Sequence, residues 1–357
     1  MEFFTMSKKI ITAMTAATLA ASMVLTGCGS KDKIDPNATL VSVGEEEVVS
    51  MGYGNFVAKY NQAIYDQIYV SYFGSVMWDQ EVGEEGTMED SVKKQIMDDM
   101  ERYYVSGLHA SDYDVAISDE QQANIEAAAK KFLEDNDEEA IEQMGATEEY
   151  LIRFLQEQTI AQMVEDKVEA EAEVNITDEE AIQSTVSYVL YASTSTDDQG
   201  NATELSKEEL VALKENAEKL AAAEDFAAEA EAQEVTAQKY SYTKAADAAE
   251  DTVLGEAVIT AAKALKNGET SAVIEVEGKG YYVVHMEATE DDEATATKRE
   301  NLEKDARNTY YDDQISAWEK DIDWKVDEEQ WSKVTFEKYF STAETKEDTT
   351  EEATTEE

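Results

Sequence analysis

The stretch AVIEVEGKGYYVVHM, residues 272–286, contains two runs of alternating apolar and polar residues separated by the glycine-containing sequence GKG. Such runs on either side of a short glycine turn predict a β-hairpin. Just before it, apolar residues recur at helical spacing over residues 258–265 and Gly268 follows them. This pattern predicts a helix that ends shortly before the hairpin. A helix and a hairpin alone cannot bury their apolar faces, so further elements must pack against them.

The residues upstream supply those elements. VSYVLYA, residues 186–192, is uncharged and alternates, which predicts a strand, and KYSYTKA, residues 239–245, predicts a short second strand. Between them, STSTDDQGNATELS is read as a loop, and Ser206 with Glu209 forms a capping box at the start of a helix. A second capping box, Thr177 with Glu180, precedes the first strand. The sequence therefore predicts a small α+β domain over residues 178–290.

The rest of the chain is predominantly helical by its pattern. LVSVGEEEVVS, residues 40–50, predicts two short strands around an acidic turn, and a long helix begins at Met51. Its predicted buried face carries Phe56, Tyr60, Ile64, Ile68 and Tyr72. Three more helical stripes follow before about residue 175, one of them opened by a capping box of Ser118 and Gln121.

A long helix resumes after the α+β segment. The apolar residues of its stripe are Leu302, Ala306, Tyr310, Ile315, Trp318 and Ile322, and Trp324 and Trp331 follow it. These residues need a partner, and the N-terminal helical segment is the obvious one. We therefore expect residues 40–177 and 291–340 to form one helical domain into which residues 178–290 are inserted.

The composition excludes several classes of function. The chain of 357 residues carries 29 Lys and Arg against 81 Asp and Glu, a net charge of −52. Such a surface repels phosphate backbones, so nucleic-acid binding is excluded. With two histidines and one cysteine, there is no Ser–His–Asp or Cys–His arrangement and no intrachain disulfide. The acidic loops do not follow the twelve-residue calcium pattern, so no metal and no cofactor is expected.

The N-terminus predicts export. Lys8 and Lys9 precede an uncharged run that ends in LTGC, with Cys28 last. A basic start, a short apolar core and small residues before a cleavage point are typical of a secretory signal peptide, here residues 1–27. The LTGC ending resembles the bacterial lipobox, which implies a lipid on Cys28, a polar tether over residues 28–39 and a location on the outer face of the cytoplasmic membrane. Met6 is an alternative start, because Glu2 is unusual in such a segment.

Taken together, these pieces resemble the PrsA/SurA-type foldases, which carry a parvulin-type peptidyl-prolyl isomerase domain. VSVGEEEVVS is similar to the opening strand pair of their chaperone domain, and NITDEEAI is similar to the linker before their parvulin domain. EDFAAEAEA is similar to a helix motif of parvulins, and AVITAAKALKNGETSAVIEVEGKGYYVVHMEA is similar to the end of that domain. The resemblance implies an α+β fold: a mostly helical, SurA N-like chaperone domain with an inserted parvulin-like domain. The last residues, 341–357, are acidic, and their composition predicts disorder.

This sequence departs from the parvulin pattern at the site. Where the family carries its two histidines, this chain has Tyr188 and Tyr282; where it lines the proline cup with Met and Phe, the chain has Leu254 and Val258. The usual glycine-rich stretch is replaced by TKAADAAEDTVLG, and the two histidines, His109 and His285, match neither position. His285 is three residues beyond Tyr282 and is expected on the opposite strand face.

Isomerisation of a prolyl bond needs no nucleophile. It needs an apolar cup that holds the proline ring while the amide, with a barrier of about 18–20 kcal/mol, twists. A phenol both donates and accepts hydrogen bonds, so Tyr188 and Tyr282 are the candidate catalytic residues, with Leu254 and Val258 as candidate substrate contacts. The smaller cup favours an anchored foldase for unfolded secreted polypeptides whose isomerase activity is weak or absent. The alternatives are an active isomerase that uses these tyrosines and, more remotely, a solute-binding lipoprotein.

Overall fold

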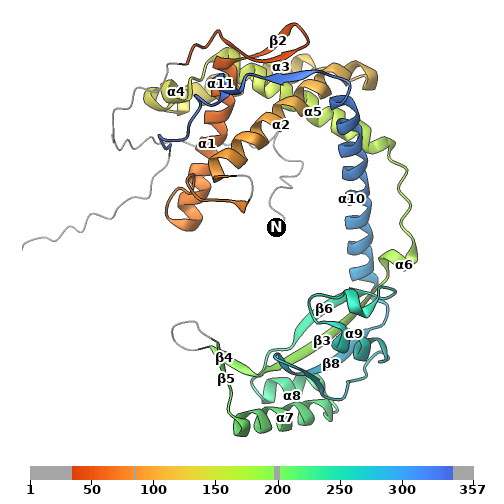
Figure 1. Cartoon of the computed structure of the whole chain (residues 1–357). Coiled ribbons are helices and arrows are strands. Elements are labelled where there is room, and N and C mark those ends of the chain that lie inside the picture. Colours follow the sequence, from red (N-terminus) through yellow and green to blue (C-terminus); the bar gives the residue numbers. More distant parts are fainter. Residues whose placement is uncertain (1–33, 84–85, 197–201, 341–357) are drawn as a thin grey trace, which may run out of the picture. The chain divides into compact units, whose positions relative to one another are not determined.

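The computed structural model describes residues 34–83, 86–196 and 202–340 (Figure 1). These residues form two compact units. Unit 1 contains the described residues up to Glu171 and those from Tyr310 onward, and unit 2 contains Ala172–Thr309. The predicted signal peptide, Cys28 and the acidic tail over 341–357 lie outside the described residues.

Unit 1 is mostly helical and includes one small sheet. Its elements are β1 (Thr39–Val43), β2 (Glu46–Ser50), α1 (Met51–Phe73), α2 (Met88–His109), α3 (Asp119–Asp135), α4 (Glu138–Met144), α5 (Glu148–Glu171), the end of α10 (Asp292–Glu319), β9 (Trp324–Val326) and α11 (Glu328–Trp331). The sheet has the order β2-β1-β9, and both pairings are antiparallel. Strand β1 therefore pairs with a neighbour in sequence on one side and with a strand from the far end of the chain on the other.

An aromatic cluster lies in the core of unit 1. Phe56 on α1 is 0% exposed, and its ring centroid lies about 6 Å from those of Tyr53, Tyr60, Tyr150 and Phe154. The edge contact with Phe154 is perpendicular, at 90°. Such contacts add to the burial of apolar area. Phe56 therefore links α1 to α5 at the centre of the unit.

The apolar stripe predicted for α1 is wrong at Ile64 and Tyr72, whereas Tyr60 and Ile68 pack against the core. Phe56 is buried, but Ile64 is 40% exposed and Tyr72 is 80% exposed. Successive steps of four residues rotate by about 40° around an α-helix, so a strict i, i+4 series drifts off one face. The buried positions later in the helix are Ala63 and Tyr69 instead.

A similar displacement occurs in α10. The sequence pattern predicts that Tyr310 faces inward, but Tyr310 is 39% exposed, whereas its neighbour Tyr311 is 3% exposed and packs with Ile315 and Trp318. The sequence offered two adjacent tyrosines, and the helical phase set by Ile315 and Trp318 selects the second. Trp318 also stacks on His109, with ring centroids 4.3 Å apart.

After α11 the chain continues through residues 334–340, VTFEKYF, without helix or strand. We call this segment the strap. The side chains of Val334, Phe336 and Phe340 in the strap are 0%, 1% and 1% exposed. They belong to the same hydrophobic core as α1 and α2. The strap is therefore a buried part of unit 1 despite its irregular backbone.

Asp66 on α1 is completely buried at the end of the strap. Its carboxylate accepts hydrogen bonds from the indole nitrogen of Trp78 and from the backbone N–H of Phe340, both at 2.7 Å. Burial raises the pKa of Asp66 from 3.8 to about 6, although these two hydrogen bonds and the charge of Lys59 oppose the rise. Asp66 therefore takes up a proton in the folded unit at a higher pH than in the unfolded chain.

This shift predicts how stability changes with pH. Between pH 4 and 6 the folded state retains a proton that the unfolded state has released, so raising the pH across this window favours unfolding. A shift of about two pKa units corresponds to about 3 kcal/mol. We expect the free energy of unfolding of unit 1, measured relative to Asp66→Asn in urea titrations, to fall by up to that amount from pH 4 to 6. A difference that does not change with pH would contradict the prediction.

Unit 2 is a four-stranded antiparallel sheet with helices on both faces. Its elements are α6 (Asp178–Ala181), β3 (Gln183–Ala192), β4 (Thr194–Thr196), β5 (Ala202–Glu204), α7 (Lys207–Ala221), α8 (Phe226–Ala232), β6 (Gln238–Thr243), α9 (Glu256–Lys263), β7 (Ile274–Val276), β8 (Gly280–Ala288) and the first part of α10. The strand order is β6-β3-β8-β7. Residues of α9 pack on one face of the sheet, and residues of α7 and α8 pack on the other.

Local signals placed several boundaries of unit 2 correctly. Thr177 and Ser206 both cap their helices and form complete capping boxes with Glu180 and Glu209. The prediction of a loop over residues 193–206 is wrong in part, because β4 and β5 pair antiparallel there. Their residues are Thr, Ser, Ala and Glu, so the strands lack the apolar alternation by which a strand is recognised in a sequence.

The predicted hairpin is formed by β7 and β8. Gly278 and Gly280 have φ values of 74° and 129°, which side-chain-bearing residues rarely adopt. A Cβ at Gly280 would also lie against the carbonyl oxygen of Tyr191 and 2.8 Å from the amide nitrogen of Ser193. This glycine therefore allows the first residue of β8 to approach the end of β3.

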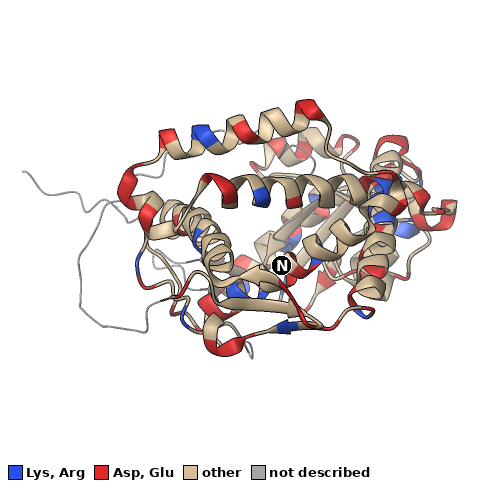
Figure 2. Ribbon diagram, turned by 90° about the horizontal axis from the view of Figure 1, so that it is seen from above, with Lys and Arg blue, Asp and Glu red and all other residues tan. Residues whose placement is uncertain are grey.

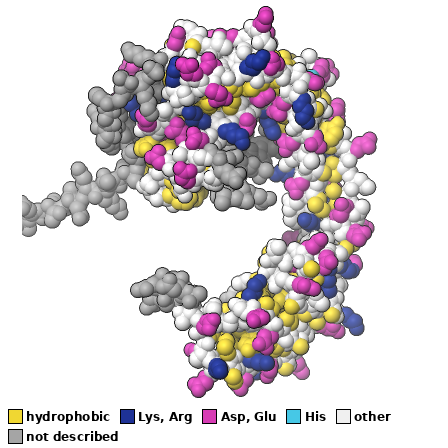
Figure 3. Space-filling model, viewed as in Figure 1, with side chains coloured by type: hydrophobic (Ala, Val, Ile, Leu, Met, Phe, Trp, Pro, Cys, Tyr) yellow, Lys and Arg dark blue, Asp and Glu magenta, His cyan; other side chains and the backbone are white. Residues whose placement is uncertain are grey.

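The acidic charge is distributed over the helices of both units (Figure 2). Apolar side chains also reach the surface: Tyr72 and Phe73, at the end of α1, are 80% and 64% exposed. The space-filling view shows hydrophobic side chains gathered on parts of the surface of each unit (Figure 3). Among the described residues, no helix has the length and apolar character that crossing a membrane would require.

Candidate functional site

The two candidate tyrosines lie on one face of the sheet in unit 2. In the β3–β8 register, Tyr188 is opposite Val284 and Leu190 is opposite Tyr282, so the tyrosines are diagonal neighbours. Their ring centroids are 6.2 Å apart and the rings are tilted by 33°. The structure thus brings together two residues that are 94 positions apart in sequence.

Leu254 and Val258 lie against the same face. Together with Tyr282 they belong to one hydrophobic cluster, which Tyr188 borders. Leu254 is 2% exposed, Val258 0% and Tyr282 3%. In this conformation these three side chains are packed core and offer no open cup for a proline ring. Tyr188, at the border of the cluster, is only partly buried.

Sequence reasoning missed a third tyrosine and its partner. Tyr240 on β6 also borders the cluster, and its hydroxyl donates to a carboxylate oxygen of Asp251 at 2.7 Å. The other carboxylate oxygen of Asp251 accepts the backbone N–H groups of Val253, Leu254 and Gly255. The loop that presents Leu254 is therefore fixed by one aspartate. The alternation in KYSYT signalled Tyr240, but nothing in the sequence linked it to Asp251.

The ionisation of this pair is well defined. Burial opposes the charge on Asp251, but the hydrogen bonds from Tyr240 and from the loop amides outweigh it and lower the pKa of the carboxyl. Burial and the adjacent Asp251 raise the pKa of the Tyr240 phenol. At neutral pH the pair is therefore a neutral phenol that donates to a carboxylate.

The hydrogen bonds limit what the tyrosines offer a substrate. The hydroxyl of Tyr188 donates to the amide oxygen of Gln238 at 2.6 Å, as that of Tyr240 does to Asp251. With their protons engaged, both hydroxyls have only acceptor lone pairs to spare. The face thus presents aromatic rings and acceptors, which suits binding of apolar chain segments with free N–H groups. Assisting a twisting amide needs donors and an open cup.

His285 lies on the other face of the sheet, as predicted from strand alternation. Its ring stacks on Phe226 with centroids 5.3 Å apart, and its Nδ1 is 2.9 Å from the hydroxyl of Thr270. His109 belongs to unit 1, where it is 2.8 Å from a carboxylate oxygen of Asp112. His285 is therefore on the face opposite the two tyrosines, and His109 is part of the other unit.

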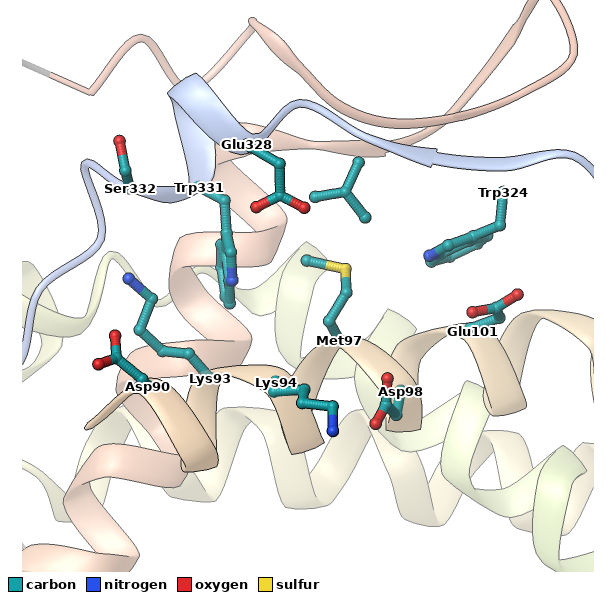
Figure 4. Close-up of a pocket in the computed structure, with 11 residues that line it drawn as sticks. Asp90, Lys93, Lys94, Met97, Asp98, Glu101, Trp324, Glu328, Trp331 and Ser332 are labelled. Atoms are coloured by element: carbon teal, nitrogen blue, oxygen red, sulfur yellow. The ribbon is translucent and has the colours of Figure 1, made fainter. Parts of the chain in front are cut away.

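Unit 1 contains a cleft of about 480 Å³ between α2 and the β9–α11 segment (Figure 4). Met97, Trp324 and Trp331 supply its apolar walls, and charged side chains from α2 supply its rim. The indole nitrogen of Trp324 is buried and has no hydrogen-bond partner among the described residues. Figure 4 shows this nitrogen on the side of the ring that faces Met97. The cleft is therefore lined by apolar surface, with a buried N–H donor in one of its walls.

Glu101 lines the same cleft. Burial, together with the charges of Glu319 and Asp98, raises the pKa of Glu101 from 4.5 to about 7. Among the described residues, no group of three or more His, Cys, Asp or Glu side chains is arranged to hold a metal ion. Glu101 is thus a carboxyl of the cleft lining that titrates near neutral pH.

Residues 194–299 match the family model described as the PPIC-type PPIase domain. Unit 2 is a PPIC-type, or parvulin, domain. This match confirms the parvulin-type family and the α+β fold class predicted from the sequence. The matched residues include β8, which carries Tyr282, and β6, which carries Tyr240, while Tyr188 lies just before the match.

Several solved structures are similar to the chain. A structure of the foldase PrsA from Streptococcus pneumoniae is 18% identical, covers 71% of this chain and 95% of its own, and has a TM-score of 0.30. A PrsA from Bacillus cereus is 16% identical, with 72% and 96% covered and the same TM-score. A structure of the SurA-like chaperones of Campylobacter jejuni is 12% identical, with 81% and 99% covered and a TM-score of 0.26. No curated protein matches the chain, and the assignment of the parvulin domain rests on the family model.

Proposed function

We propose that this protein is an extracytoplasmic foldase that holds unfolded secreted polypeptides, and that its parvulin domain is a weak or inactive isomerase. The observation that carries the proposal is the tyrosine face of the parvulin domain. Tyrosines stand at both histidine positions, and Leu254 and Val258 are buried beneath them. A face of this kind favours holding a chain over accelerating its isomerisation.

Features of unit 1 support the same role. The cleft beside Trp324 has apolar walls and charged side chains from α2, which suit the apolar and polar groups of an unfolded chain. Tyr72 and Phe73 add exposed aromatic surface at the end of α1. We propose that residues 40–177 and 291–340 form the client-holding domain and that residues 178–290 are its parvulin insert.

Two assays on one preparation test this function. We expect the protein to slow the aggregation of a chemically unfolded client protein. In the same preparation, the cis–trans isomerisation of a proline tetrapeptide should keep its uncatalysed time constant of tens to hundreds of seconds. Tyr188→Phe serves as the control, because it keeps the ring and removes the hydroxyl. We expect this variant to behave like the wild type in both assays. No effect on aggregation would contradict the foldase proposal.

The second candidate function is an active isomerase that uses tyrosines. The ordered Tyr240–Asp251 pair beside Tyr188 favours it, because an enzyme needs fixed polar groups next to the bound proline. In that case the tetrapeptide reacts faster with the wild type than without it, and Tyr188→Phe, Tyr282→Phe or Leu254→Ala removes the acceleration. A rate that these substitutions leave unchanged would count against this candidate.

We propose further that a lipid on Cys28 anchors the protein to the outer face of the membrane. The support is the LTGC sequence after a basic, then uncharged, N-terminus. We expect cells fed a palmitate analogue to label the wild type and leave Cys28→Ala unlabelled, with the variant found in the medium or retained as an uncleaved precursor. Equal labelling of the two would refute the anchor.

A further inference from the structure

The backbone of the strap is held by side chains and not by a neighbouring strand. Four helix side chains donate to its carbonyl groups: Lys93 to Val334 (2.6 Å), Lys59 to Thr335, and both Gln62 (2.7 Å) and Gln143 of α4 (3.2 Å) to Lys338. Its N–H groups donate to two carboxylates: Phe336 to Glu89 (3.1 Å) and Phe340 to Asp66 (2.7 Å). Positively and negatively charged side chains of α1 and α2 therefore form hydrogen bonds with the polar groups of an extended main chain.

The helix side chains that make these bonds are regularly spaced along α1 and α2. Lys59, Gln62 and Asp66 follow one face of α1, and Glu89 and Lys93 are one turn apart on α2. Gln62 and Asp66 are 0% exposed. Buried polar side chains are costly unless hydrogen-bonded, and a core evolved only for packing would hold apolar residues here. The two helices thus form a groove whose polar groups match a peptide backbone.

Side-chain pockets complete the groove. Val334 and Phe336 are alternate residues of the strap and both point into the core, and Phe340 is buried four residues later. The ring of Phe336 meets that of Trp78 edge-on at 4.6 Å between centroids. Main-chain hydrogen bonds with pockets for selected side chains are the usual way in which a protein binds an extended peptide of loosely defined sequence.

We propose that the strap is an internal ligand of a polypeptide-binding groove between α1 and α2, and that an extended client segment with aromatic or aliphatic side chains at this spacing displaces it. The inference rests on the proposed function as a foldase and names a site for its clients. The groove binds the main chain and apolar side chains, so its clients share a pattern of apolar residues and not one sequence.

The position of the strap in the chain permits this exchange. It follows β9 and α11 in the chain. Its residues take no part in the pairing of β9 with β1. Because the strap is tethered, it competes at a high effective concentration and lowers the apparent affinity for any client. Loosening the strap must therefore raise that affinity.

The test uses the full chain and a fluorescent peptide with the sequence of residues 332–340. We expect Phe340→Ala to bind the peptide at least tenfold more tightly than the wild type does, because its own strap competes less well. Lys338→Ala is the matched control: its side chain is exposed and its carbonyl remains, so its affinity should equal that of the wild type. A peptide with alanine at both phenylalanine positions should not bind. Equal affinity of folded Phe340→Ala and wild type overturns the inference.

Hydrogen exchange on the wild type decides the matter even if Phe340→Ala does not fold. If the strap is displaceable, the amides of Phe336 and Phe340 exchange by local opening, faster than buried amides in α1. Exchange of these two amides only at the rate of global unfolding of unit 1 overturns the inference. Both amides are suitable probes because each is hydrogen-bonded to a side chain.

Aggregation assays separate this inference from the proposed function. Tighter peptide binding by Phe340→Ala, without any effect of either protein on client aggregation, supports the groove and contradicts the foldase role. Equal suppression of aggregation by both proteins, without peptide binding to Phe340→Ala, supports the foldase role and overturns the groove.

Discussion

Substituting Gly280 by alanine is expected to unfold the parvulin domain or to destabilise it by about 3 kcal/mol or more. The new Cβ would overlap the carbonyl oxygen of Tyr191, which is backbone and cannot rotate away. The φ of 129° adds strain that only glycine avoids. Relief requires β3 and β8 to separate where the domain has its longest strand pairing.

Gly278→Ala is the matched control for this substitution. Gly278 also has a positive φ, 74°, but a Cβ there would meet no atom within 4 Å. Gly278→Ala should lower the free energy of unfolding of the parvulin domain by about 1 kcal/mol, from the backbone conformation alone. All four tryptophans, Trp78, Trp318, Trp324 and Trp331, belong to unit 1. In Gly280→Ala, hydrogen exchange over residues 183–288 should therefore show the lost stability of the parvulin domain, while tryptophan fluorescence remains native. Equal stability of the two variants would contradict the expectation.

Substituting Phe56 by alanine should lower the free energy of unfolding of unit 1 by about 3–5 kcal/mol. The side chain is 0% exposed and touches aromatic residues of α1 and α5 on several sides. Its removal leaves a cavity that rings held by other contacts cannot fill, and it also ends the edge contact with Phe154. Urea titration followed by tryptophan fluorescence measures the change.

Phe73→Ala removes the same side chain from the same helix. Phe73 is 64% exposed at the end of α1, so its removal should change stability by no more than about 0.5 kcal/mol. The comparison isolates burial from helix propensity, since phenylalanine is replaced by alanine in both cases. Similar losses at the two positions would mean that Phe56 is not the centre of the core.

The parts of the fold that were predictable are those that depend on neighbouring residues. The capping boxes at Thr177 and Ser206 need only the residue three positions later, and the β7–β8 hairpin needs only its turn and alternation. The paired tyrosines were predictable through the family resemblance, because Tyr188 and Tyr282 stand in recognisable motifs. In both cases the information lies within a few residues.

The parts that were missed depend on partners distant in sequence. The burial of Tyr311 in place of Tyr310 is set by the elements packed against α10, and the partner of Tyr240 lies in a loop without pattern. The closed state of Leu254 and Val258 depends on how the whole face packs. The burial and hydrogen bonding of VTFEKYF could not be predicted from its own residues, because its partners Lys59, Gln62 and Asp66 lie more than 270 residues away.

The place of β1 at the centre of its sheet has a consequence for the order of folding. A chain synthesised from its N-terminus presents β1 and β2 about 280 residues before β9. The parvulin domain, complete by Thr309, has all of its sequence available earlier. Unit 1 must close over a chain separation of about 280 residues, a slow step of high contact order. Until β9 emerges, the edge of β1 that pairs with it remains free to pair with other chains.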